Sequence, residues 1–352
     1  MLGMGPFGYP ADYLLWWLLF LSLLLHTWCF FRFFPRPRRR LRLLLGNSLI
    51  FFCLAGCAGL LAESYIRFLS VQTESFGLSL PARRWFALYV KLNSLGCRDV
   101  EWSMEKPPDV RRIAFVGDSF TYGWGIERVE ERFTDRIQSE FGHRAPGRVQ
   151  VMNVAKPGWD TGAQLAPIQD LIDRFAIDEV VLCYVCNDIE KVLPVSGDFN
   201  PTRPPEPRWF NPESSCLIDS LYWTFYVPRC PTVRGYHDWL ADGFANEATW
   251  RRHQEQLAAI IELCKDRGVT MRATLLPFLR VGGTKFDTRR IHGAVRTFFE
   301  VNGVRVVDLR PAVEGERPER WVVSSRDGHP NAEAHDRFAK AIWDSLYAQP
   351  RN

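Results

Sequence analysis

Two long apolar runs near the N-terminus, separated by a short arginine-rich segment, constrain the fold of this chain more than any other feature. Residues 14–31 are eighteen positions at which only His26 can gain a charge near neutral pH, and residues 43–62 are twenty positions without a charge. Both runs approach the length that a helix needs to cross a hydrocarbon core of about 30 Å. Backbone groups in lipid must bond within their own segment, so the runs predict two transmembrane helices, over about residues 14–34 and 43–62.

Two other interpretations of these runs are weaker. Core helices of a soluble protein rarely stay uncharged over such a length. A signal peptide needs positive charge before its apolar run, and no Lys or Arg precedes Arg32. We therefore expect residues 1–62 to form an N-terminal membrane anchor.

The segment between the runs carries the positive charge that orients such a hairpin. Eleven residues hold six arginines and no other charge, namely Arg32, Arg36, Arg38, Arg39, Arg40 and Arg42. Loops rich in arginine stay on the cytoplasmic side of a membrane. The N-terminus and everything after residue 63 are then expected on the extracytoplasmic side, and a bacterial inner membrane is the favoured location.

The same arginines account for the positive charge of the whole chain. Its 352 residues include 44 Lys and Arg against 40 Asp and Glu, a formal charge of +4. Without the six arginines the balance is 38 against 40, or −2, so the charge predicts no nucleic-acid partner. With 47% hydrophobic residues the chain has material for a large core, which excludes the disulfide-scaffold, collagen-like and disordered classes.

After a juxtamembrane linker over residues 63–110, strand-like and helix-like segments alternate. In the linker, residues 82–92 favour a short interfacial helix. Strands are expected at residues 111–117, 149–155, 179–186, 269–276 and 304–309, and helices at residues 130–141, 162–175, 246–267, 286–301 and 331–347. This alternation predicts an α/β domain over residues 111–348, with three layers in which helices cover both faces of a parallel sheet.

An irregular insertion at about residues 194–245 interrupts the alternation. It is rich in Pro, Trp and Tyr and has no clean period, so it could form a wall of a substrate site. Its aromatic side chains could line a sugar or acyl site, or they could be the ordinary core of an irregular subdomain. They are Trp209, Phe210, Tyr222, Trp223, Phe225, Tyr226 and Trp239.

Two pairs among the nine cysteines need interpretation. Cys183 and Cys186 are three residues apart on an expected strand and point to opposite faces, which argues against a redox pair. Cys216 and Cys230 lie in a loop-rich region that the topology places outside the cytoplasm. A disulfide between them is compatible with that compartment, and so are two free thiols.

The sequence contains no convincing motif for a cofactor or a metal. Residues 3–8 match the dinucleotide pattern GxGxxG, but they follow no strand. No phosphate-binding P-loop and no HExxH pair occur, and His329 and His335, the best histidine pair, are six residues apart. We therefore expect neither a cofactor nor a metal.

Four groups of polar residues fall where the expected elements of the α/β domain meet. Ser119 follows the first strand in Gly117–Phe120 (GDSF), and the group Asn153–Gly158 (NVAKPG) follows the second. Asn187 and Asp188 follow the third strand, and Asp327–Asn331 (DGHPN) precedes the last helix. Because parallel sheets place their sites beyond the carboxyl ends of their strands, these groups are expected to share one edge. A serine on a tight turn at such an end can be held as an exposed nucleophile.

In their order and placement, these groups resemble the four blocks of the SGNH (GDSL-type) hydrolase superfamily, over about residues 111–348. The resemblance implies that Ser119 is the nucleophile and His329 the general base. It also implies an oxyanion hole formed by the Ser119 backbone N–H, Gly158 and Asn187. Asp327 stands where the acid of the triad is expected.

The chain departs from the superfamily pattern in two places. The acid usually lies three residues before the histidine, where this chain has Arg326, whereas Asp327 lies two before His329. Residues two apart on an extended segment face the same side, so contact is possible but its geometry is in question. The glycine usually found two residues before the asparagine of the third block is replaced by Val185.

These residues predict a membrane-anchored serine esterase that cleaves O-acyl esters, with O-acetyl esters favoured, through an acyl-serine intermediate. The expected topology favours an acylated polysaccharide, glycan or lipid of the cell envelope as substrate. Two alternatives remain open. The acyl-serine could be released to a sugar hydroxyl in an O-acyltransferase, which would need a membrane partner as acyl donor. The domain could also be a non-catalytic, membrane-tethered binding module.

Overall fold

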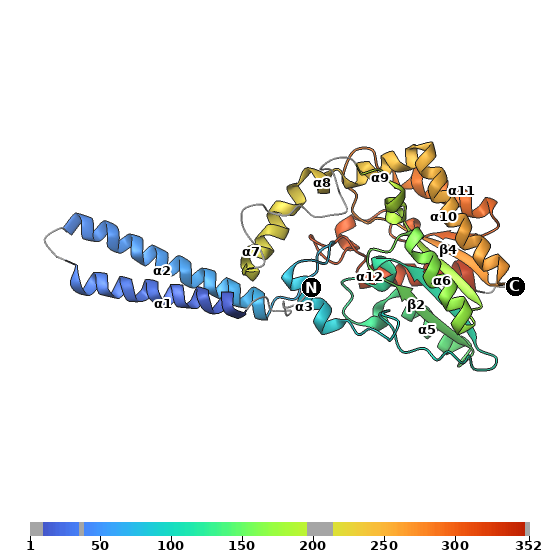
Figure 1. Ribbon diagram of the computed structural model, residues 1–352, viewed down its shortest axis with the longest axis horizontal. Coiled ribbons are helices and arrows are strands. Elements are labelled where there is room, and N and C mark those ends of the chain that lie inside the picture. The colour runs from blue at the N-terminus through green and yellow to red at the C-terminus, as the bar shows by residue number, and fades with distance from the viewer. Residues whose placement is uncertain (1–9, 35–38, 196–213, 349–352) are drawn as a thin grey trace. The chain divides into compact units, whose positions relative to one another are not determined.

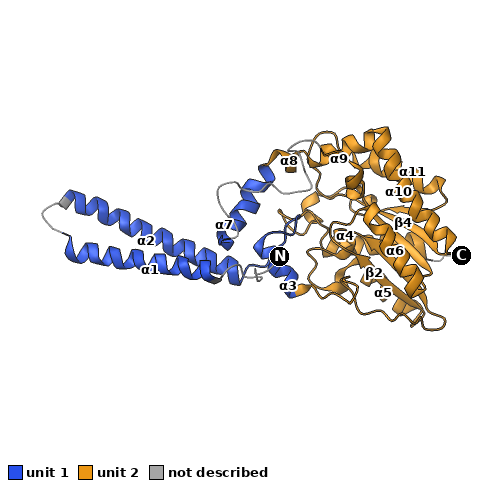
Figure 2. Ribbon diagram, viewed as in Figure 1, with its two compact units in different colours: residues 1–88, 205–229 blue, residues 89–204, 230–352 orange. Residues whose placement is uncertain are grey.

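A computed structural model describes residues 10–34, 39–195 and 214–348 of the chain. The chain divides into two compact units, one of residues 1–88 with 205–229 and one of residues 89–204 with 230–352 (Figure 2). The first unit contains the apolar helices and the second contains the sheet. The segment between the third and fourth strands therefore contributes to both units.

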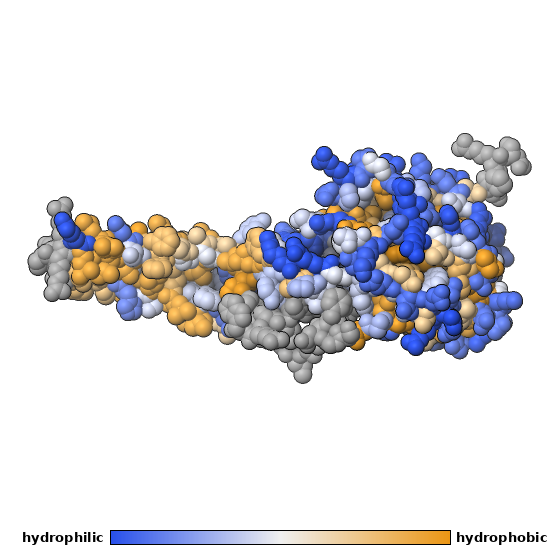
Figure 3. Space-filling view, turned by 90° about the horizontal axis from the view of Figure 1, so that it is seen from above, coloured by the Kyte–Doolittle hydropathy of each residue, from blue (hydrophilic) through white to orange (hydrophobic). Residues whose placement is uncertain are grey.

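The first unit begins with two long apolar helices, α1 (Pro10–Phe33) and α2 (Arg39–Phe68). At 1.5 Å per residue, the 24 residues of α1 extend about 36 Å, which exceeds the ~30 Å hydrocarbon core of a bilayer. Both helices are long and apolar enough to span a membrane. Large apolar side chains cover their outer surface, as Figure 3 shows.

Small residues and aromatic rings join the two helices. A Cβ on Gly56 would lie 3.0 Å from the Phe20 ring, and a Cβ on Gly46 would lie 2.9 Å from the Phe31 ring. At the other end of the hairpin, the Tyr13 hydroxyl and Ser64 Oγ are 2.8 Å apart. Rings packed against glycine backbone allow close contact between the two helices.

The rest of the first unit consists of short helices that follow the hairpin. Helix α3 (Leu80–Tyr89) covers most of the range at which the sequence favours a short helix. Helix α7 (Cys216–Leu221) continues into a π-helical turn (Tyr222–Tyr226) and a 3₁₀ turn (Val227–Arg229). This part of the expected irregular insertion is thus helical.

The second unit is built on a parallel sheet of five strands in the order β2-β1-β3-β4-β5. The strands are β1 (Arg111–Gly117), β2 (Val149–Ala155), β3 (Glu179–Val185), β4 (Thr270–Leu276) and β5 (Arg305–Asp308). The main helices are α5 (Phe133–Arg144), α6 (Thr161–Phe175), α10 (Glu247–Asp266), α11 (Thr288–Val301) and α12 (Ala332–Ile342). The predicted α/β class and parallel sheet are confirmed (Figure 1).

Two hydrophobic clusters cover the opposite faces of this sheet. In β1, Ala114 and Val116 belong to one cluster, whereas Ile113 and Phe115 belong to the other. The first cluster includes side chains of α6, α10 and α11, and the second includes side chains of α5 and α12. Alternating residues of a strand point to opposite faces, so an all-apolar strand is stable only between two helical layers.

The segments around β3 and β4 complete the second unit. A helical turn (Cys186–Val192) follows β3, and α8 (Pro231–Arg234) and α9 (Tyr236–Ala245) precede α10. Trp239 of α9 donates from Nε1 to the Pro194 carbonyl at 3.1 Å and belongs to a small core with Leu240. Trp209 and Phe210 lie outside the described residues.

Neither Cys216 nor Cys230 forms a disulfide in this structure, so the pairing that the sequence left open is not present. Both are buried, and burial raises the pKa of Cys216 to about 12. Cys183 and Cys186 are also free and fully buried. The thiolate is the reactive form of cysteine, and burial disfavours it. These cysteines are therefore suited to packing and not to reaction.

Candidate active site

The turn between β1 and α4 (Ser119–Tyr122) holds Ser119 at the carboxyl edge of the sheet. Asp118 caps this short helix, because its Oδ1 accepts a hydrogen bond from the Phe120 N–H at 2.9 Å. A Cβ on Gly117 would lie only 2.3 Å from Thr121 Oγ1, so the strand can turn into the helix this closely only at a glycine. The turn therefore fixes the Ser119 side chain at the start of a helix.

Ser119, His329 and Asp327 form one hydrogen-bonded chain. Ser119 Oγ lies 2.8 Å from His329 Nε2, and His329 Nδ1 lies 2.6 Å from Asp327 Oδ1. The same Asp327 oxygen accepts from the His329 backbone N–H at 3.1 Å. With a proton on Nδ1, the imidazole donates to Asp327 and can accept the Ser119 proton at Nε2.

The loop that carries His329 explains why an acid two residues away can reach it. Val322 and Pro330 form an antiparallel bridge, and the Val323 N–H donates to the His329 carbonyl at 2.9 Å. Asp327 closes a turn with Ser324, since its N–H donates to the Ser324 carbonyl at 3.2 Å. Although Asp327 lies two residues before His329 instead of three, the short hairpin brings its carboxylate and the imidazole together.

Aromatic side chains surround the imidazole. The ring centroid of Phe120 lies 5.2 Å from that of His329, and the Trp124 centroid lies 6.3 Å away. His329 is 6% exposed and Asp327 is fully buried. Low-polarity surroundings strengthen the hydrogen bonds of this chain by keeping water from them.

His335 takes no part in this arrangement. It is fully buried, its Nδ1 accepts from the Phe133 N–H at 3.1 Å, and its ring stacks on the Phe133 ring. Burial lowers its pKa to about 3, with nearby arginines acting in the same direction. His335 thus packs between α5 and α12 as a neutral ring.

Asn187 lies beside the turn that carries Ser119, through a contact that the sequence did not predict. Its Nδ2 donates to Asp118 Oδ2 at 3.2 Å. Since Asp118 directly precedes Ser119, this bond links the end of β3 to the Ser119 turn. Gly158 follows β2 with a φ of +78°, and a Cβ there would meet nothing within 4 Å. The structure thus joins Ser119, His329 and Asp327 directly and Asn187 through Asp118. Gly158 lies after the end of β2, the strand next to β1, and has the backbone conformation that favours glycine.

Buried carboxyl groups lie behind this turn. Burial raises the pKa of Asp118 and Asp188 above the ordinary value, and the Asp118 carboxyl raises the pKa of Asp188 further. Asp188 accepts from the Val185 N–H at 3.2 Å and from Gln164 Nε2 at 3.4 Å. Among the described residues, no group of three or more His, Cys, Asp or Glu side chains is placed to hold a metal ion.

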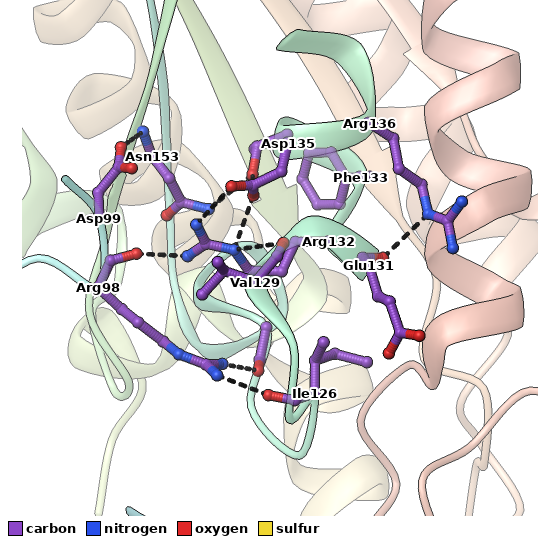
Figure 4. Close-up of polar contacts among 12 residues, drawn as sticks. Arg98, Asp99, Ile126, Val129, Glu131, Arg132, Phe133, Asp135, Arg136 and Asn153 are labelled. Carbon is purple, nitrogen blue, oxygen red and sulfur yellow. Dashed lines mark hydrogen bonds and ion pairs between the residues drawn. The ribbon is translucent and has the colours of Figure 1, made fainter. Parts of the chain in front are cut away.

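Two buried arginines hold the segment that follows α4 (Figure 4). Arg98 donates to the carbonyls of Gly123 at 2.8 Å and Ile126 at 2.7 Å. Arg132 donates to the Arg98 carbonyl and pairs with Asp135, with 2.8 Å between Nε and Oδ2. Sequence reasoning missed both, because neither Arg98 in the expected linker nor Arg132 in an expected helix carries a local sign of burial.

A cavity of about 420 Å³ opens at the ends of β4 and β5. Phe278 lines it and also packs on Phe120, with centroids 5.9 Å apart. Trp321 lines the cavity just before the loop that carries His329. The charged side chains Arg289, Arg310 and Glu314 complete its wall. The Phe120 ring therefore lies between Phe278 in the cavity wall and His329 in the hydrogen-bonded chain.

Comparison with protein families identifies this chain. The model of the GDSL-like lipase/acylhydrolase family matches residues 115–337, which include most of the sheet, Ser119 and His329. The chain belongs to this family. As a member it is a hydrolase that acts on ester bonds, as expected from the resemblance to SGNH hydrolases.

Solved structures of similar proteins are distant. The psychrotrophic esterase EstA from Pseudoalteromonas sp. is 12% identical with a TM-score of 0.43, over 67% of this chain and 96% of that chain. A catalytic mutant of Axe2, an acetylxylan esterase from Geobacillus stearothermophilus, is 15% identical with a TM-score of 0.42, over 68% and 95%. A search of curated protein sequences found no match.

Proposed function

We propose that this protein is a membrane-anchored serine esterase that hydrolyses O-acyl esters, O-acetyl esters first among them, of an envelope polysaccharide, glycan or lipid. The observation that carries the proposal is the hydrogen-bonded chain from Ser119 through His329 to Asp327. A serine hydroxyl is a weak nucleophile until an adjacent base takes its proton, and this chain supplies that base and orients it.

Acylation begins when Ser119 Oγ attacks the acyl carbonyl carbon while His329 Nε2 takes the hydroxyl proton. The negative charge on the carbonyl oxygen is stabilised by N–H donors, for which the Ser119 and Gly158 backbones and the Asn187 amide are the candidates. Loss of one such donor typically lowers kcat by about 10²–10³. When the intermediate collapses, the ester C–O bond breaks and the imidazolium protonates the departing alcohol.

Deacylation repeats these steps with water. His329 takes a proton from the water as its oxygen attacks the acyl carbon, and Ser119 Oγ leaves with that proton. Asp327 orients the imidazole and stabilises the imidazolium through Nδ1–H. The products are a carboxylic acid and an alcohol, and the enzyme returns to its starting state.

The location of the substrate follows from the anchor. Two helices long enough to cross a bilayer, joined by the arginine-rich segment, support a hairpin with its loop in the cytoplasm. The N-terminus and the hydrolase domain would then lie on the extracytoplasmic side, and the inner membrane of a bacterium is the proposed location. Acylated envelope glycans and lipids are the esters within reach of such a domain.

Covalent labelling of the full chain in detergent micelles tests the catalytic roles. A fluorescent fluorophosphonate should label the parent protein, and Ser119→Ala and His329→Ala should abolish the labelling. Asn331→Ala, which alters the cap of α12, provides a control close to His329 outside the hydrogen-bonded chain. Failure of the folded parent to label would overturn the proposal.

A second assay separates hydrolysis from acyl transfer. The parent protein should release the chromophore of an aryl acetate without any glycan, because water completes the reaction. If turnover instead required an added glycan acceptor, the protein would be an O-acyltransferase, and a membrane partner would have to supply its acyl groups.

A further inference from the structure

The depth of Glu63 in the proposed membrane can be derived from helix geometry. Twenty residues of α2 separate Glu63 from Leu43, where the apolar run begins, and they rise about 30 Å. This rise equals the thickness of a hydrocarbon core. Glu63 therefore lies where α2 leaves the lipid tails on the side away from the arginine-rich segment. Glu63 forms an ion pair with Arg67 at 2.8 Å, and such charged groups are expected at the edge of the lipid tails and not among them.

The chain between β3 and β4 is attached to α2 at the same level. The Glu63 carboxylate accepts from Ser215 Oγ at 2.6 Å and from the Cys216 and Leu217 N–H groups at 3.0 and 2.7 Å. These donors form the start of α7, so the carboxylate fixes the helix by its N-terminus. A second bond attaches α7 to the start of α3, because the Asp219 carboxylate accepts from the Leu80 N–H at 2.8 Å.

The outer side of this attached segment is apolar. Leu221, Phe225 and Tyr226 are 47%, 55% and 50% exposed, whereas Tyr222 and Trp223 are buried within the first unit. Leu221 and Phe225 are four residues apart, the spacing of neighbours on one helix face. The segment thus has one face packed on the unit and another with large apolar side chains exposed.

The chemistry of the exposed face matches a lipid interface. Arg229 donates to the Phe225 carbonyl at 2.5 Å and lies 5.9 Å from the centre of the Phe225 ring. Aromatic rings with arginine at their edge are typical of the level where lipid tails meet headgroups. Among the described residues of this unit, α3 adds Phe86 and Leu88, which are 37% and 53% exposed.

We propose that the segment Cys216–Arg229 docks on the bilayer that α1 and α2 cross. Leu221 and Phe225 insert at the boundary between tails and headgroups, and Tyr226 and Arg229 lie among the headgroups. The partner is the lipid surface itself, because the segment is attached to α2 at the depth of that surface. This inference rests on the proposed membrane crossing and not on the chemistry of Ser119.

Spin-label depth measurements on the full chain test the docking. Phe225→Cys carries a nitroxide in nanodiscs of phosphatidylcholine and phosphatidylglycerol, and its relaxation by oxygen is compared with relaxation by a water-soluble nickel complex. Leu54→Cys, at a 67% exposed position within α2, is the lipid reference. Val301→Cys, at an 80% exposed position at the end of α11, is the water reference. The parent protein, labelled in the same way, gives the signal of the native cysteines, which is subtracted from that of each variant.

The oxygen-to-nickel ratio at Phe225→Cys should be several-fold above that at Val301→Cys and below that at Leu54→Cys. A ratio equal to the water reference would overturn the docking, and so would shielding from both reagents, which indicates a protein partner such as a second copy. Leu221→Cys gives a second reading on the same face should Phe225→Cys fail to fold. A water-like ratio at Leu54→Cys would instead show that the membrane crossing fails. Loss of fluorophosphonate labelling would concern only the esterase.

Discussion

At the scale of single residues, the carboxylate of Asp327 decides how well the imidazole is oriented. Its Oδ1 contacts both the His329 ring, at 2.6 Å, and the His329 backbone N–H, at 3.1 Å. Asp327→Asn keeps the size of the side chain but can donate to Nδ1 and favour the wrong tautomer. We expect kcat for an aryl acetate to fall on the order of 10⁴-fold with KM little changed. An unchanged kcat would show that Asp327 does not act through His329.

The buried carboxyl of Glu190 should make the free energy of unfolding depend on pH. Burial raises its pKa to about 7, while the hydrogen bond from the Tyr236 hydroxyl opposes the shift. Because the folded-state pKa lies above the ordinary 4.5, the unfolded chain releases its proton first as the pH rises. The stability that Glu190 contributes is therefore full below about pH 4 and is lost as the pH rises through about 7.

Glu190→Gln stays neutral and can still accept from Tyr236. It should unfold at the same temperature as the parent at about pH 4 and at a higher temperature at about pH 8. The free-energy difference there should approach about 3 kcal/mol. Glu255→Gln on the exposed side of α10 is the matched control. Equal melting of Glu190→Gln and parent at the higher pH would contradict the raised pKa.

At the scale of elements, helix α4, which carries Ser119, depends on residues far from it in sequence. Arg98 is fully buried and donates to the carbonyls of Gly123 and Ile126, which follow α4. Each buried carbonyl left without a donor costs about 1–3 kcal/mol. Arg98→Met should therefore destabilise the protein by about 2–6 kcal/mol and slow the labelling of Ser119 at temperatures where it stays folded.

A nearby exposed arginine provides the comparison for this prediction. The Arg128 side chain is 75% exposed and pairs only with Glu131 among the described residues. Arg128→Met should leave both the melting temperature and the labelling rate at parent values. Equal effects of the two substitutions would mean that general charge, and not the donors of Arg98, supports the segment.

The elements that could be predicted from sequence are those whose own residues determine them. The runs that form β1 and β2 are apolar and bounded by polar residues, so their expected ranges match the strands found. Helix α7 could not be predicted, because its six residues are stabilised by the distant carboxylate of Glu63. Likewise the motifs located Ser119 and His329, whereas the link from Asn187 to Asp118 arises only when the ends of β1 and β3 meet.

At the scale of the whole molecule, we expect one short segment to set the side of the membrane on which the proposed esterase works. The six arginines between the apolar runs are the strongest orienting signal near the N-terminus, because no Lys or Arg precedes Arg32. Replacing four of them by glutamine removes most of this charge and leaves both apolar runs unchanged. The positions are Arg36, Arg38, Arg39 and Arg40.

This variant should invert a large fraction of the molecules. A reporter fused after residue 348 that is active only outside the cytoplasm should lose most of its signal, and a cytoplasmic reporter at the same position should gain it. The matched control replaces four exposed arginines of the second unit by glutamine, namely Arg289, Arg290, Arg296 and Arg317. These lie far along the chain from both helices, so orientation should not change. If the loop variant kept the parent orientation, the charge between the runs would not set the topology. The proposed envelope substrate would then need another argument.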